Sequence, residues 1–133
     1  IDLSDDEHRL WIRDFEGTAA VLDIESGTVL ARFDAGPSHG GIDVVPGGRY
    51  VATVAIGGRN VLLIDQKALK PVRTIEVGQG PHGVRASPDG RWLYVGLTGD
   101  NQIAVIDMET LEVARKVATD GDFPFWLAIP GNR

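Results

Sequence analysis

The sequence has no cysteine and only one methionine among its 133 residues. The absence of cysteine excludes disulfides, thiolate nucleophiles, cysteine-ligated zinc and covalent haem attachment through a C-x-x-C-H motif within the chain. No apolar run approaches the roughly 18 residues of a membrane-spanning helix, and no basic segment precedes an apolar stretch as in a signal peptide. We therefore expect no disulfide framework and no membrane insertion.

Basic residues are outnumbered, whereas glycine is abundant. The chain has 13 Lys and Arg against 19 Asp and Glu, which gives a formal net charge of −6. Because nucleic acids need a basic surface on their protein partner, no nucleic-acid partner is expected. The 17 glycines and 7 prolines predict many turns between short strands.

One segment pattern occurs three times along the chain. The strings AVLDIESGTVLARF, LLIDQKALKPVRTI and AVIDMETLEVARKV place Asp23, Asp65 and Asp107 at intervals of 42 residues. A second marker, a proline followed three residues later by an arginine, keeps the same interval, in the pairs Pro46 and Arg49, Pro88 and Arg91, and Pro130 and Arg133. Two independent markers with one period indicate a repeat protein.

Each repeat has the pattern of four short strands. In the third repeat we expect strands at 83–87, 92–97, 103–107 and 112–117, separated by turns rich in Gly, Pro, Asp and Asn. Apolar residues occupy nearly every position of the middle strands, as in sheets that are covered on both faces. Four antiparallel strands in each 40–45 residues or so, repeated radially, are typical of a β-propeller. We therefore predict an all-β β-propeller with four-stranded antiparallel blades.

The spacing also predicts the blade boundaries. Blade 1 is expected at about 1–35, blade 2 at about 36–78 and blade 3 at about 79–120, all within a single propeller segment. A fourth blade would start at about 121–133 with a strand at 125–129. Because propellers close with four to eight blades, we expect a segment of a ring of about seven, closed by further sequence or by a second copy.

The pieces GQGPHGVRASPDGRWLYVG and NQIAVIDMETLEV resemble the YVTN family of β-propeller repeats. That family has the approximate pattern P-x-G-V-x-x-S-P-D-G, then L-Y-V, then V-x-V-I-D-x-x-T, and the resemblance covers essentially the whole chain. It implies a bacterial or archaeal scaffold in the periplasm or outside the cell. It also implies a non-catalytic module that binds a protein or a small molecule through its loops, although one propeller fold serves many functions.

An enzymatic alternative comes from propellers that look similar. These are the haem d1 domain of cytochrome cd1 nitrite reductases, amine dehydrogenase subunits and lactonases of the 6-phosphogluconolactonase kind. In the nitrite reductase family, histidines that face the channel serve the haem pocket, and His39 and His82 are the candidates for that role here. The catalytic motifs G-x-S-x-G and H-E-x-x-H are absent, as are phosphate-loop and dinucleotide fingerprints. We therefore expect a binding module with no catalytic residue and no cofactor, and keep haem d1 or a metal as the alternative.

His39 and His82 each lead into the first strand of a repeat, and Phe125 holds the equivalent position one repeat later. First strands line the channel of a propeller, so we expect these three side chains on one rim as a ligand-binding site. A zinc site needs three or four protein ligands, and no third histidine is available there, so no metal site is predicted. Loops on the same face add further candidate contacts, namely Arg59, Asp100 and Asn101.

The three repeated aspartates have a structural interpretation. Asp23, Asp65 and Asp107 end the third strand of each repeat, where a carboxylate accepts backbone N–H bonds across a turn. Metal binding is the alternative for these aspartates, but one carboxylate in each blade lies far from the next. Near the end of the chain, Phe123 and Trp126 are expected to be core residues, with stacking in the channel as their alternative.

Overall fold

The computed structural model describes residues 1–131, which form twelve β-strands. Arg133, the third arginine of the repeat, and the end of the expected fourth blade lie outside the described residues. No described segment is helical, so none is a helix long and apolar enough to cross a membrane. The all-β prediction is confirmed.

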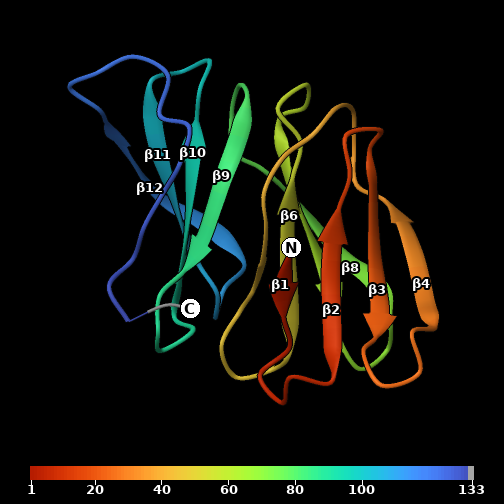
Figure 1. Cartoon of the computed structure of the whole chain (residues 1–133). Helices are drawn as coiled ribbons and strands as arrows, with labels where there is room; N and C mark the ends of the chain where they lie inside the picture. The colour runs from red at the N-terminus through yellow and green to blue at the C-terminus, as the bar shows by residue number, and fades with distance from the viewer. Residues whose placement is uncertain (132–133) are drawn as a thin grey trace.

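The strands form three antiparallel sheets, each in chain order (Figure 1). The first sheet comprises β1 (Asp2–Leu3), β2 (Arg9–Arg13), β3 (Thr18–Asp23) and β4 (Val29–Asp34). The second comprises β5 (Ile42–Val44), β6 (Tyr50–Val54), β7 (Asn60–Asp65) and β8 (Lys70–Glu76). The third comprises β9 (Pro81–Ala86), β10 (Trp92–Leu97), β11 (Gln102–Asp107) and β12 (Glu112–Ala118).

The first strand of each sheet lies on the inner side of the array. The inner strand β5 contacts both β1 and β9, whereas β4, β8 and β12 lie at the opposite edges of their sheets. The three sheets therefore stand side by side as radial blades, as Figure 1 shows.

The core lies between neighbouring sheets, and the middle sheet contributes to both halves of it. In β6 and β7, Val51 and Ile64 pack against Trp11 of the first sheet, whereas Val61 and Leu63 pack with Leu93 and other apolar residues of the third sheet. Successive side chains of a strand point to opposite faces, so a strand covered on both faces needs apolar residues at both its odd and its even positions. This explains the continuous apolar runs of the middle strands.

Hydrogen bonds and glycines join the inner strands. Asp2 accepts the backbone N–H of Val44 at 2.7 Å, and Asp43 accepts that of Ala86 at 2.7 Å, so each carboxylate ties its own sheet to the next. A Cβ atom at Gly41 would lie 2.8 Å from the carbonyl oxygen of His82, and the Gly41 N–H donates to that oxygen. Only glycine fits so close an approach between two backbones.

The segment after β12 differs from the prediction. Residues 125–129 were expected to form a strand, but they do not. No described sheet includes this segment, and no further described strand pairs with it. Phe123 and Trp126, expected in the core, are 55% and 73% exposed. They are exposed because no described sheet packs over this segment.

Candidate functional site

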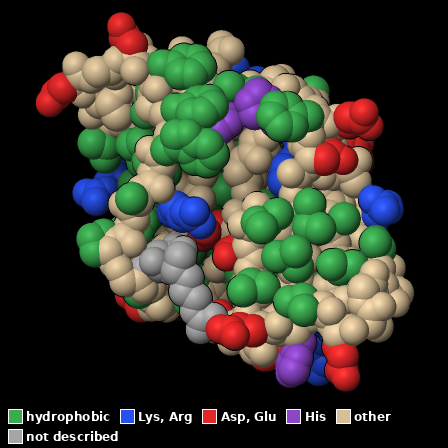
Figure 2. Space-filling model, viewed as in Figure 1, with side chains coloured by type: hydrophobic (Ala, Val, Ile, Leu, Met, Phe, Trp, Pro, Cys, Tyr) green, Lys and Arg blue, Asp and Glu red, His purple; other side chains and the backbone are tan. Residues whose placement is uncertain are grey.

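Aromatic and histidine rings gather at the end of the sheets where β9 begins. His82 stacks on Phe125 with ring centroids 3.6 Å apart, His39 lies 5.1 Å from His82, and Phe15 lies 4.8 Å from His39. Trp126 meets His82 edge-on at 5.3 Å. We call these five side chains the aromatic rim. Figure 2 shows histidine between hydrophobic side chains at the upper edge of the molecule.

The structure therefore brings together the three channel residues that the repeat spacing singled out. His39 comes from the β4–β5 connection, His82 from β9 and Phe125 from the segment after β12. Equivalent positions of successive repeats fall on the same rim because each sheet has the same orientation towards the channel. Phe15, in the β2–β3 loop, and Trp126 are added by the structure.

His82 is held in one tautomer. Its ring nitrogen Nδ1 lies 3.1 Å from the carbonyl oxygen of Phe125. Because a carbonyl can only accept, Nδ1 carries the proton and donates it, which leaves the lone pair on Nε2. Burial lowers the pKa of His82, opposed by the bond to Phe125, and the nearby His39 lowers it further. A neutral imidazole with a free Nε2 is suited to ligating a metal centre or accepting a hydrogen bond.

Arg13 supports the backbone that carries His39. Its guanidinium side chain is only 2% exposed and donates to the carbonyl oxygens of Gly36 at 3.1 Å and Ser38 at 2.7 Å. Ser38 has a φ of 68°, a left-handed conformation that is unusual for a residue other than glycine. Arg13 therefore fixes a strained connection, a role with no signal in the repeat pattern.

The predicted loop residues lie on the same face but contact other groups. Arg59 pairs with the exposed Glu76 at 3.3 Å, and Asp100 accepts the N–H of Gln79 at 2.8 Å. Asn101 donates to Asp122 at 2.9 Å and accepts the N–H of Phe123 at 2.9 Å. Asn101 thus anchors the start of the segment that carries Phe125 and Trp126.

The three repeated aspartates accept hydrogen bonds across their turns. Asp23 accepts the backbone N–H and the hydroxyl of Ser26. Asp65 accepts the N–H groups of Lys67 and Ala68, and Asp107 accepts those of Glu109 and Thr110. Within the described part of the chain, no three His, Asp or Glu side chains converge to hold a metal ion.

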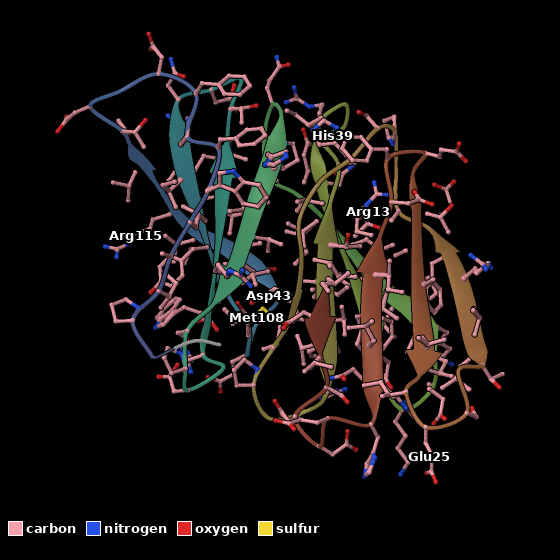
Figure 3. All side chains as sticks on the ribbon, in the orientation of Figure 1. Arg13, Glu25, His39, Asp43, Met108 and Arg115 are labelled. Atoms are coloured by element: carbon pink, nitrogen blue, oxygen red, sulfur yellow. The ribbon has the colours of Figure 1, made fainter. Side chains whose placement is uncertain are left out.

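A cleft of about 210 Å3 lies beside the aromatic rim on the channel side of the inner strands. Gly41 and Gly83 belong to its walls, and Trp126 links it to the rim. Arg85 lines the same cleft and pairs with Asp43, whose side chain is 1% exposed. In Figure 3, Asp43 lies between the inner strands, on the side towards β9.

This arrangement matches the requirements of a haem-like group better than those of a bare ion. Two imidazoles are too few for a closed zinc site, but one would be enough to hold a haem iron. The exposed faces of Phe15 and Trp126, at 78% and 73%, offer apolar area to a flat macrocycle. The residues present therefore fit one side of a haem pocket.

Comparison with known proteins agrees with this geometry. The family model described as the cytochrome D1 heme domain matches residues 10–123. The chain superposes on hydrazine synthase of Kuenenia stuttgartiensis with a TM-score of 0.87 and 25% identity, covering 93% of this chain and 36% of that one. It superposes on the dihydro-heme d1 dehydrogenase NirN, solved in complex with DHE, with a TM-score of 0.76 and 25% identity, covering 97% and 30%.

The chain spans about a third of the length of the two solved chains. No curated protein matches the sequence.

The comparisons confirm the β-propeller prediction but support no specific relation to the YVTN repeats. The expectation that the protein uses no cofactor is wrong, since the matching family is a haem domain and NirN was solved with DHE. The redox alternative is likewise better supported than the non-catalytic module. The family match covers most of the chain, so this β-propeller chain belongs to the cytochrome D1 haem domain family.

Proposed function

We propose that this chain forms one wall of a haem d1 pocket in a redox protein and that the aromatic rim receives the macrocycle. The observation that carries the proposal is the stack of His82 on Phe125 at 3.6 Å, with His39 5.1 Å from His82, in a chain of a haem domain family. The YVTN-like sequence pattern would then be the repeat of a haem d1 propeller.

Each side chain of the rim has a distinct task in this proposal. When bound, haem d1 supplies a redox-active iron. His82 is buried with its lone pair on Nε2, and its Nδ1–H bond to the Phe125 carbonyl keeps the ring in place. His39 is half-buried and lies at the same opening, 5.1 Å from the His82 ring. Phe15 and Trp126 cover the macrocycle and exclude water from it.

Titration of the chain with haem d1, followed by the visible absorption spectrum, tests the proposal. We expect a saturable spectral shift, and an affinity about tenfold or more weaker in His39→Ala and in His82→Ala, as for the loss of a ligand or its support. His8→Ala is the matched control, because His8 lies in the turn before β2, at the opposite end of the sheet. A spectrum unchanged by haem d1, or equal binding by all four proteins, would overturn the proposal.

We further propose that the protein functions in the periplasm or outside the cell, with the rim completed by additional blades or by a second copy. The support for the location is the resemblance to exported propellers, and the support for completion is the open array of three sheets. Cell fractionation of the native host tests the location, since recovery of the full protein in the cytosol would contradict it.

A further inference from the structure

The turns at the end of the sheets away from the aromatic rim differ in charge from one repeat to the next. In the third sheet, Arg91 forms an ion pair with Glu109. The equivalent residues of the middle sheet, 42 positions earlier, are Arg49 and Lys67, so a second cation stands where the third sheet has the acidic partner. The first sheet again has an acidic residue at this position, Glu25 (Figure 3). The reversal of charge therefore belongs to the middle repeat.

A second acidic side chain is missing from the same turn. In the third sheet, Asp89 accepts hydrogen bonds from the hydroxyl of Ser87 and the N–H of Arg91. The middle sheet has Val45 and Gly47 at the positions of Ser87 and Asp89. A Cβ atom at Gly47 would meet no described atom within 4 Å. The middle turn therefore has open space where the third sheet holds a carboxylate.

The two cations of the middle turn have no partner among the described residues. Arg49 and Lys67 are exposed, and neither forms an ion pair or donates a side-chain hydrogen bond within the described chain. Arg49 lies over the ring of Tyr50, 4.8 Å from its centroid. Asp65 is the acidic residue that this turn retains, and its carboxylate accepts the N–H groups of Lys67 and Ala68. Both cations are thus available to an anionic group from outside the chain.

Two adjoining hollows open at these cations. The first, of about 660 Å3, is lined by Gly47, Gly48, Arg49, Asp65, Lys67 and Ala68. The second, of about 330 Å3, shares Gly47 and Arg49 with the first and has Tyr50, Met108 and Leu111 among its walls. These last three side chains are half-buried and pack against the core. We call Arg49, Lys67 and the two hollows the basic turn surface. An anion held by its cations would have an apolar hollow beside it.

The backbone donors of this turn are already used. The N–H of Gly47 donates to the carboxylate of Asp5 at 3.0 Å, and the N–H of Gly48 donates to the carbonyl oxygen of Val45 at 3.3 Å. A phosphate would lack the backbone N–H groups that commonly cradle it, and its double charge would meet the Asp5 carboxylate. A singly charged carboxylate needs only the donors of the two side chains.

Charge and shape together favour a peptide as the ligand. Glu109 also lines the second hollow, but its pair with Arg91 neutralises it. We propose that the basic turn surface binds an acidic segment of a partner protein. A carboxylate side chain of that segment meets Arg49 and Lys67, and a neighbouring apolar side chain enters the hollow at Met108. This interaction is independent of the proposed haem function, because it uses the opposite end of the sheets.

Three blocked tripeptides test the proposal. They are acetyl-Glu-Leu-Glu-amide, the uncharged acetyl-Gln-Leu-Gln-amide, and acetyl-Glu-Gly-Glu-amide, which lacks the apolar side chain. The readout is the dissociation constant from the backbone amide shifts of Gly47, Gly48 and Lys67 in NMR titrations of the whole chain at low ionic strength. We expect Glu-Leu-Glu to bind about tenfold more tightly than Gln-Leu-Gln, as for one hydrogen-bonded charge pair. It should bind about threefold more tightly than Glu-Gly-Glu, because leucine leaves water in the hollow.

Variants then assign the preference to the two cations. Lys67→Glu gives the middle repeat the arrangement of the third, in which a glutamate neutralises the arginine. Glu25 and Glu109 occupy this position in the other repeats, so we expect the variant to fold and to lose its preference for the acidic peptide. Arg49→Gln should lose the preference as well. Arg115→Glu is the matched control, because it makes the same change of charge at an exposed residue of the outer strand β12, and it should keep the preference.

Each other result would overturn the proposal. Equal binding of the Glu-Leu-Glu and Gln-Leu-Gln peptides by the wild type, or binding of neither, would show that the surface recognises no acidic segment. Equal binding of Glu-Gly-Glu would remove the apolar hollow from the interaction. A preference that survives Lys67→Glu, or that Arg115→Glu abolishes, would show that these cations are not responsible. If inorganic phosphate binds as tightly as the acidic peptide and shifts the same amides, the surface takes a free anion instead of a protein segment.

Discussion

At the scale of single residues, the turn aspartates keep their charge because the folded chain uses it. The pKa of Asp65 lies below its ordinary value chiefly because its carboxylate accepts the N–H of Ala68, with Lys67 as a second donor. The pKa of Asp23 is also lowered, chiefly by the hydrogen bond from the Ser26 hydroxyl. The pKa of Asp107 is lowered chiefly by the N–H of Glu109. An ionised acceptor satisfies backbone donors that the turn leaves without partners.

Among the described residues Asp65 forms no ion pair, whereas Asp107 also pairs with Arg91, so Asp65 is the best position to test such a turn. We expect Asp65→Ala to lower the melting temperature by roughly 4 °C, as for the loss of a capping side chain. Asp65→Asn keeps one acceptor oxygen and should lose less. Thermal unfolding followed by circular dichroism measures both, and Asp65→Ala melting together with the wild type would show that this carboxylate holds no turn.

Aspartates also predict how stability depends on pH. Six have a pKa lowered from the ordinary 3.8 in the folded chain, the three repeated ones and three others: Asp6, Asp14, Asp23, Asp65, Asp89 and Asp107. The unfolded chain therefore takes up protons first, so their contribution is present above pH 3.8 and is lost as the pH falls through the folded values. Asp43 acts in the opposite direction, because burial raises its pKa.

We expect the free energy of unfolding to fall as the pH is lowered from 5 to 3, because six aspartates have a lowered pKa and only Asp43 has a raised one. Urea unfolding at pH 5, 4 and 3 measures this. Asp65→Asn, which cannot titrate at that position, should lose less stability over the same range than the wild type. A wild-type unfolding midpoint that stays constant or rises towards pH 3 would contradict the conclusion that the charged aspartates stabilise the fold.

At the scale of strands, the sequence pattern predicts a strand correctly where the residues of that segment and its flanking turns determine it. The strand at 92–97 is predicted at the bounds of β10, because turn residues flank an apolar run on both sides. The strand at 125–129 is not formed, because a strand needs a neighbour to pair with, and sequence pattern does not supply one. The meeting of His39, His82 and Phe125 was predictable from the repeat period. The supporting role of Arg13 and the pairing of Arg85 with Asp43 depend on contacts between sheets that no local pattern encodes.

The close approach of the inner strands gives a test at this scale. Gly41→Ala would place a methyl group 2.8 Å from the carbonyl oxygen of His82. We expect a loss of about 1–3 kcal/mol of unfolding free energy, as for overpacking, together with weaker haem d1 binding because β9 must move. Gly121→Ala is the control, since a Cβ there meets nothing within 4 Å. Urea unfolding and the absorption titration measure both effects, and Gly41→Ala behaving like Gly121→Ala would disprove the constraint.

At the scale of the whole molecule, the first sheet has one covered face and one open face. Trp11 and Val21 point into the core and are 0% exposed. Their neighbours Leu10 and Leu22, which pair across β2 and β3, point the other way and are only half-buried. The equivalent pair of the second sheet, Val51 and Ile64, is 0% exposed because the first sheet covers it. Figure 2 shows hydrophobic side chains gathered over this open face of β1–β4.

The open face predicts association. A contiguous apolar surface of this kind favours burial against another surface, whether a further blade or a second copy. We expect the 133-residue chain at micromolar concentration to elute above the 14.3 kDa of a monomer in size exclusion with light scattering, and its melting temperature to rise with concentration.

Leu22→Lys should shift the chain towards the monomer, because a charge on the open face cannot be buried without a partner. Val72→Lys, on the outer strand β8 where the side chain is already 43% exposed, should leave association unchanged. A wild-type chain that is monomeric and melts cooperatively at one temperature over a hundredfold range of concentration would show that the open face needs no cover.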